Sequence, residues 1–114
     1  MKKELYVYIL QCSDGTYYTG VTNDLDRRVG EHNTEETEES KKSYVYSRRP
    51  AKLVFAESFS EYNDAIEFEK KIKGWRREKK EAMIQGNYER LIELSKTAKD
   101  DYWAAKESPS TGSG

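Results

Sequence analysis

The sequence predicts an α/β (α+β) fold whose elements follow the order β-β-α-β-α-α. Three segments rich in β-branched and aromatic residues predict strands, and three segments with apolar residues at helical spacing predict helices. The strands are expected at 5–12, 16–22 and 52–59, and the helices at about 24–33, 61–84 and 88–96. With 114 residues, of which 35% are hydrophobic, the chain has room for one core. We therefore expect one domain over residues 1–96 and a C-terminal tail, 97–114, with the composition of disorder.

The first two strands are expected to form a hairpin. The segment 5–12 has apolar side chains on both alternating faces, which is typical of a strand covered on both sides, and Ser13-Asp14-Gly15 is a turn signal. Tyr8 and Tyr18 then lie on neighbouring strands, where their hydroxyls could point toward the same face. Because the chain contains nine tyrosines, these two alone are weak evidence for a functional role.

The first helix carries two ionisable groups among its apolar residues. Asn23 can cap this helix at its N-terminus. Arg28 and His32 lie four residues apart on the apolar side of the helix, so both should border the sheet. Taken alone, His32 is more often a histidine at the edge of a core than a catalytic one, and Arg28 is more often an ion-pair partner.

The remaining segments are expected to connect and cover the strands. Residues 34–50 hold an acidic run followed by a basic and aromatic one with no sustained period, which indicates a mobile surface loop. The third strand leads through a Ser60 cap into the long helix, which is expected to bend at Gly74. The acidic run at 35–39 would repel DNA if it lay near a binding cleft.

Glu69 is the most unusual residue of the long helix. At 100° per residue it falls near the middle of an apolar stripe that includes Ala65, Ile66 and Ile72. Because burial of an unpaired charge is costly, such a carboxylate is normally paired with a cation, bound to a metal or shifted in pKa. A structural ion pair and a metal ligand are both open on this evidence.

These polar groups suit the hydrolysis of a phosphodiester bond. Glu69 would hold one divalent cation, and Arg28 would neutralise charge on the phosphate. Tyr8, Tyr18 and His32 could take the proton of the attacking water. A carboxylate with few companions suits Mg²⁺ or Mn²⁺, since Mg²⁺ keeps several waters and binds through one or two carboxylates plus substrate phosphate.

Positive charge is concentrated in the middle of the chain. Residues 41–84 hold 12 basic and 7 acidic side chains, against 4 and 9 in residues 1–40, although the net charge of the chain is -1. This local excess could meet a phosphate backbone, with solvated surface as the alternative. The residues expected to bind nucleic acid are Arg48, Arg49, Lys70, Lys73, Arg76 and Arg77.

Cysteine content and hydropathy indicate the compartment. The single cysteine, Cys12, cannot form an internal disulfide. No apolar run approaches the ~20 residues that a membrane-spanning helix needs. We therefore expect a cytoplasmic protein with no membrane partner.

The order and spacing of the polar residues resemble the GIY-YIG nuclease superfamily, and more closely its small stand-alone bacterial members. The matching positions are Tyr6-Val7-Tyr8, Tyr18-Thr19-Gly20, Arg28, His32, Arg48-Arg49-Pro50 and Glu69. Neither tyrosine motif is identical to that of the family, because Tyr6-Val7 replaces the usual Gly-Ile and Thr19 replaces an isoleucine. The resemblance covers roughly residues 4–95. It implies a three-stranded antiparallel sheet flanked by helices, one divalent cation at the glutamate and a tyrosine, Tyr18, as general base.

These observations together predict a metal-dependent DNA endonuclease that acts on branched, damaged or single-stranded forms, in DNA repair or processing. Candidate stacking groups for unpaired bases are Tyr17, Tyr44, Tyr46 and Trp75. Sequence specificity is expected to be weak or supplied by a partner protein. The alternatives are a non-catalytic nucleic-acid-binding module and a protein-interaction domain with a surface rich in tyrosine and tryptophan.

Overall fold

The computed structural model describes residues 4–96, so the predicted tail at 97–114 lies outside the described residues. The chain falls into two compact units, residues 1–69 and residues 70–114. The expectation of one domain over residues 1–96 stays a prediction. Among the described helices, none has the length and apolar character that a membrane crossing requires.

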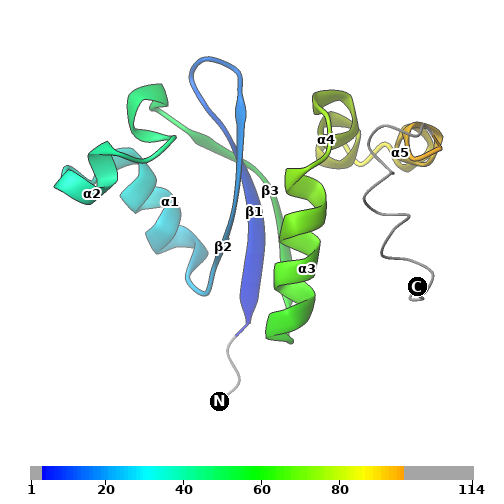
Figure 1. Ribbon diagram of the computed structural model, residues 1–114, viewed down its shortest axis with the longest axis horizontal. Coiled ribbons are helices and arrows are strands. Elements are labelled where there is room, and N and C mark those ends of the chain that lie inside the picture. Colours follow the sequence, from blue (N-terminus) through cyan, green and yellow to red (C-terminus); the bar gives the residue numbers. More distant parts are fainter. Residues whose placement is uncertain (1–3, 97–114) are drawn as a thin grey trace. The chain divides into compact units, whose positions relative to one another are not determined.

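The first unit is built on a three-stranded antiparallel sheet in the order β2-β1-β3 (Figure 1). The strands are β1 (Leu5–Gln11), β2 (Tyr17–Thr22) and β3 (Lys52–Phe59). This confirms the predicted fold class, with strand ends within one residue of their expected positions. Tyr8 pairs with Gly20 and Leu10 with Tyr18, so Tyr8 and Tyr18 share one face of the sheet.

Helix α1 (Leu25–Thr34) covers that face. Its Leu25 and Val29 side chains pack against a buried cluster that includes Tyr8 and Leu10. The predicted cap, Asn23, is wrong by one residue, because the Asp24 carboxylate accepts the hydrogen bond from the Arg27 backbone N–H at 3.3 Å.

The segment between α1 and β3 is more regular than predicted. It contains the short helix α2 (Glu38–Lys41) and the 3₁₀ turn η1 (Tyr46–Arg48). The expectation of a loop without secondary structure is therefore wrong for these residues. Thr37 explains α2, because its hydroxyl caps the helix by accepting from the Ser40 backbone N–H at 3.0 Å.

Asn33 closes this segment at its base. Its side-chain oxygen accepts from the Ala51 backbone N–H at 2.7 Å, and its side-chain nitrogen donates to the Ala51 carbonyl at 2.9 Å. Val45, within the segment, is fully buried in the same cluster as Tyr8. The segment is thus fixed at both ends and in its middle.

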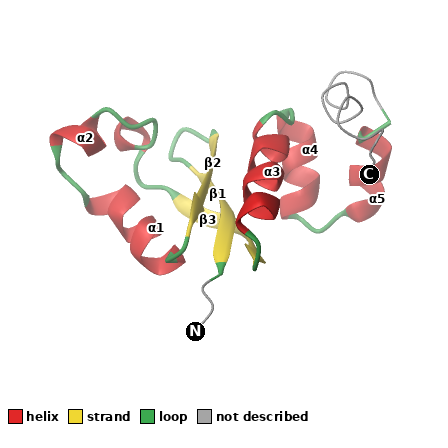
Figure 2. Ribbon diagram, turned by 60° about the horizontal axis from the view of Figure 1, so that its bottom comes forward, coloured by secondary structure: helices red, strands yellow, loops and turns green. Residues whose placement is uncertain are grey.

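Helix α3 (Tyr62–Lys73) starts in the first unit and covers the other face of the sheet (Figure 2). The Phe68 ring lies 6.4 Å from that of Phe55 and 5.2 Å from that of Phe59. Phe55 and Phe59 pair with Ile9 and Leu5 of β1, on the face opposite to Tyr8. α1 and α3 therefore lie on opposite sides of the sheet.

The long helix predicted for 61–84 is two helices rather than one bent helix. α3 ends at Lys73, and α4 (Arg77–Ile84) follows after three residues. The backbone N–H groups of Gly74 and Trp75 donate to the carbonyls of Lys71 and Ile72, and such i to i+3 bonds close the last turn of a helix.

The second unit also contains α5 (Tyr88–Leu94), which Asn87 caps by accepting from the Arg90 backbone N–H. Lys79 of α4 is buried, and its ammonium lies 4.5 Å from the centre of the Trp75 ring. Trp75, expected as a stacking group for bases, thus packs on a cation of its own unit.

Candidate active site

Tyr8 and Gly20 form the base of the candidate site. Tyr8 is 1% exposed, and a Cβ atom added to Gly20 would lie 2.5 Å from the Tyr8 hydroxyl oxygen and 2.7 Å from its Cζ. The Tyr8 ring therefore crosses β2 at the position where a side chain is absent. Gly20 is required here for close approach.

The Tyr8 hydroxyl meets His32 of α1. The distance from the Tyr8 oxygen to His32 Nε2 is 2.9 Å, and His32 is 6% exposed. The Arg28 guanidinium lies close enough for its charge to favour the ionised form of this hydroxyl. A protonated tyrosine can donate to His32 Nε2, and its oxygen can still accept a hydrogen bond.

Protonation of the pair agrees with this hydrogen bond. Burial, reinforced by Tyr18, raises the pKa of Tyr8 to about 12, although the Arg28 charge acts in the opposite direction. Burial, together with the Arg28 and Arg49 charges, lowers the pKa of His32 to about 4. At neutral pH Tyr8 is thus protonated and His32 is neutral, which makes His32 Nε2 a suitable acceptor.

Tyr18 completes an aromatic cluster around this bond. Its ring centre lies 5.1 Å from that of His32, with an angle of 65° between the planes, and 6.4 Å from that of Tyr8. The structure thus brings together Tyr8, Tyr18, Arg28 and His32, which are four of the five predicted catalytic residues.

Glu31 is a member of this site that the sequence analysis missed. Its Oε1 accepts from Arg28 Nη1 at 3.1 Å, and its Oε2 accepts from Arg27 Nη1 at 2.7 Å. These hydrogen bonds, the one from Arg27 above all, lower the pKa of Glu31. The signal in the sequence was the three-residue spacing from Arg28, which places two side chains on one side of a helix.

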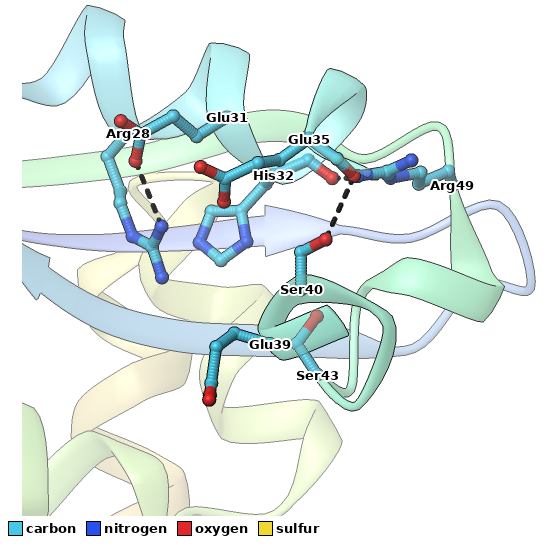
Figure 3. Close-up of a pocket in the computed structure, with 8 residues that line it drawn as sticks. All are labelled: Arg28, Glu31, His32, Glu35, Glu39, Ser40, Ser43 and Arg49. Carbon is cyan, nitrogen blue, oxygen red and sulfur yellow. Dashed lines mark hydrogen bonds and ion pairs between the residues drawn. The ribbon is translucent and has the colours of Figure 1, made fainter. Parts of the chain in front are cut away.

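A pocket of about 270 Å³ opens beside Arg28 and His32. Figure 3 shows these two side chains projecting from α1, with residues of the following segment across from them. The other lining residues are Glu31, Glu35, Glu39, Ser40, Ser43 and Arg49. The acidic run thus reaches the pocket, which is the arrangement expected to weaken DNA binding.

Arg49, predicted to bind nucleic acid, binds the protein's own backbone. Its Nε donates to the His32 carbonyl at 2.7 Å, and its Nη2 donates to the Glu35 carbonyl. Its Nη1 pairs with Glu36 at 3.0 Å, and its guanidinium lies over the Tyr46 ring. Arg49 therefore fastens the segment before β3 to the end of α1, and a contact with DNA stays a prediction.

Arg48 links the same segment to the hairpin. It pairs with Asp14 at 3.2 Å, and its guanidinium carbon lies 3.8 Å from the centre of the Tyr44 ring. Tyr44 in turn stacks on Tyr18, with ring centres 6.3 Å apart and 21° between the planes. Tyr44 is 41% exposed, so this aromatic residue borders both the cluster and solvent.

The other predicted nucleic-acid contacts belong to the second unit. Arg76 pairs with Glu78 at 3.8 Å and Arg77 with Glu81 at 2.9 Å. Lys70 and Lys73 are exposed near the end of α3. Their role in binding nucleic acid also stays a prediction.

Glu69 is half-buried on α3, one residue after Phe68. Since α3 and α1 cover opposite faces of the sheet, the structure does not gather Glu69 with Arg28 and His32 on one face. Within residues 4–96, no three His, Cys, Asp or Glu side chains are grouped to hold a metal ion. A single carboxylate from the protein fits Mg²⁺, which binds through one or two carboxylates and keeps its waters.

Comparisons with known proteins place this chain in a family. A model of the GIY-YIG catalytic domain matches residues 4–82. A UPF0213 protein of Halobacterium salinarum is 44% identical over 79 residues, which cover 69% of this chain and 97% of that protein. A UPF0213 protein of Halalkalibacterium halodurans is 38% identical over 95 residues, or 81% of this chain and 97% of that protein. The solution NMR structure of an E. faecalis protein matches 76% of this chain and 88% of its own, with 32% identity and a TM-score of 0.54.

Proposed function

This chain belongs to the GIY-YIG nuclease superfamily, and from that premise we propose that it is a metal-dependent endonuclease that hydrolyses phosphodiester bonds in DNA. The observation that carries the proposal is the buried hydrogen bond of 2.9 Å between Tyr8 and His32. It lies beside Arg28, with the Tyr18 ring against His32. A cation for the phosphate and hydroxyls for the attacking water are the groups that this hydrolysis needs.

Each residue of the cluster has a distinct proposed role. Arg28 binds the phosphate and stabilises the charge that develops on it during attack. Tyr18 takes the proton of the attacking water. Tyr8, whose pKa is raised to about 12, keeps its proton at neutral pH and donates it to His32, so its oxygen can accept a hydrogen bond from the attacking water and orient it.

Glu69 is the proposed protein ligand of one Mg²⁺ or Mn²⁺ ion. Its half-buried carboxylate and its place within the matched residues 4–82 support this assignment. Such a cation, when bound, lowers the pKa of a water and neutralises phosphate charge. The remaining chemistry belongs to Arg28 and the tyrosines.

The proposed substrate is DNA in branched, damaged or single-stranded form, processed in the cytoplasm as part of DNA repair. Tyr44 supports an unpaired base as substrate, because it is exposed and stacks on Tyr18. Basic side chains of the second unit, such as Lys70 and Lys73, would meet the backbone. A partner protein would supply targeting.

Cleavage of plasmid DNA in Mg²⁺ tests the proposal. Glu69→Ala and Arg28→Ala are each expected to lower the rate about 100-fold or more. Glu67→Ala is the matched control, because it removes an exposed carboxylate from the same helix. Unchanged cleavage by Glu69→Ala would refute the assignment of Glu69.

The same preparation distinguishes the alternatives. Turnover with Mg²⁺ and arrest with Ca²⁺ would support the enzyme. Salt-dependent DNA binding without hydrolysis in Mg²⁺, Mn²⁺ or Ca²⁺ would instead favour the non-catalytic module. No binding of DNA or RNA at low salt would favour a protein-interaction domain.

A further inference from the structure

Arg28, the arginine proposed to bind the phosphate, is already paired with the carboxylate of Glu31. Glu31 contacts Arg28 at 3.1 Å and Arg27 at 2.7 Å, and it uses a different oxygen for each. The carboxylate can therefore release Arg28 and keep Arg27. Arg27 can hold the released carboxylate, because it lies in the first turn of α1 and its side chain is 56% exposed.

The charged form of Arg28 is stabilised by a negatively charged partner when no substrate is bound. Its side chain is only partly exposed, and burial works against its charged form, whereas the hydrogen bond that Arg28 donates to Glu31 favours that form. Its other close neighbours, Tyr8 and His32, are neutral at neutral pH. A phosphate offers oxygens of the same kind as a carboxylate, so the two ligands compete for one guanidinium.

We propose that Glu31 is a placeholder for the substrate phosphate, which must displace its carboxylate from Arg28 before the phosphate can bind. The inference rests on the proposed function, because it takes Arg28 as the phosphate ligand. Glu31 is then a positioning residue that sets the affinity for DNA, and it does not touch the reacting atoms. Arg27 retains the displaced carboxylate, so exchange requires no rearrangement of the helix backbone.

Glu35 provides a matched control for simple charge removal. It lies four residues after Glu31, directly after the end of α1, and lines the same pocket. Removing either carboxylate reduces repulsion of DNA by a similar amount, but the ion pair with Arg28 belongs to Glu31. A difference between the two variants therefore reports the ion pairs of Glu31 with Arg28 and Arg27, and the same change made in an Arg28→Gln background separates the two.

The test measures binding of a fluorescent single-stranded DNA oligonucleotide without divalent cations, so that no cleavage occurs. We expect Glu31→Gln to lower the Kd about fivefold, the upper range for a partly exposed ion pair. Glu35→Gln is expected to change the Kd by less than about twofold. Glu31→Gln made in an Arg28→Gln background should give no tightening beyond that of Glu35→Gln.

The outcomes separate this inference from the proposed function. If the wild type binds no DNA, the proposed function and the placeholder both fail. If Arg28→Gln weakens binding but Glu31→Gln does not tighten it, only the placeholder fails. Equal tightening by Glu31→Gln and Glu35→Gln, or tightening by Glu31→Gln that persists without Arg28, would also overturn it. Thermal melting checks that each variant is folded, and Glu31→Ala replaces Glu31→Gln in the same comparisons if the latter is not.

Discussion

The two faces of the three-stranded sheet differ in chemistry although they share the same strand. Tyr8 and Ile9 are neighbours on β1 and both are buried, but they point to opposite sides. The Tyr8 side carries a hydrogen bond to His32 and ion pairs beyond it. The Ile9 side carries Phe55 and its ring contact with Phe68. The Tyr8 side has an apolar cluster of its own as well, so the expected contrast is between its polar groups, which should affect cleavage, and the apolar side chains of the opposite side, which should affect stability.

Ile9→Ala should have the largest effect, and this effect should be on stability. Removal of a fully buried side chain leaves a cavity, so the free energy of unfolding is expected to fall by about 2–5 kcal/mol. Cleavage per folded molecule should stay close to that of the wild type. Urea denaturation and cleavage assays on the same sample check both. A large loss of cleavage in fully folded protein would break the division between the faces.

Tyr8→Phe should show the reverse pattern. It removes one hydroxyl at the candidate site, and we expect the cleavage rate to fall about 100-fold. The free energy of unfolding should fall by roughly 1 kcal/mol, because His32 loses a hydrogen-bond partner. Single-turnover cleavage and urea denaturation are the measurements. A variant that unfolds more easily than Ile9→Ala would contradict the comparison.

Gly20→Ala and Gly30→Ala sharpen the comparison with the same added methyl group. At Gly20 the methyl group meets the Tyr8 ring, so we expect a loss of stability of about 1–3 kcal/mol, together with loss of cleavage. At Gly30, on α1, no heavy atom outside the neighbouring backbone of the helix lies within 4 Å of the added Cβ. That variant should gain roughly 0.5–1 kcal/mol, because alanine favours a helix. Thermal and urea denaturation measure the stability change of each variant. Equal effects at the two positions would be evidence against the packing of the Tyr8 ring on Gly20.

The pH dependence of stability isolates His32, the single histidine of the chain. Its pKa is about 4 in the folded protein, against an ordinary value of 6.5. The unfolded chain therefore binds the extra proton first as the pH falls. The free energy of unfolding should decrease between about pH 6.5 and pH 4, by roughly 2 kcal/mol. Urea denaturation across this range should show a smaller decrease in His32→Gln, whereas identical slopes would indicate a solvated histidine.

Much of the fold was readable from the sequence, because its strands and α1 have strong local patterns. β3 occupies the predicted residues, 52–59, and Arg28 and His32 lie on the predicted side of α1. The break after Lys73 was not readable, since Gly74 predicts a bend as well as an end. The contact between Gly20 and Tyr8 could not be predicted either, because it depends on the strand register and on the Tyr8 ring lying across β2.

The candidate site was predictable in its residues more than in its arrangement. Spacing placed Tyr8, Tyr18, Arg28 and His32 on elements that meet on one sheet face. Glu31 was missed because acidic residues are common on exposed helix surfaces and the sequence does not show which arginine they meet. The position of Glu69 relative to the others depends on which sheet face its helix covers, and helical periodicity carries no such information.

The paired hydrogen bonds between Asn33 and the Ala51 backbone hold the ends of residues 34–50 together, so this segment can vary in length wherever Val45, Arg48 and Arg49 keep their contacts. The amide side chain imitates a peptide group of a neighbouring strand and fixes the start of β3 next to the end of α1. An insertion or deletion between these two positions would lengthen or shorten the loop without shifting the register of β1 and β3. The entropic cost of closing a longer loop rises only with the logarithm of the loop length, by about 0.6 kcal/mol for each doubling. The rim of the pocket can therefore be remodelled in evolution, or by design, while the candidate site beneath it keeps its geometry.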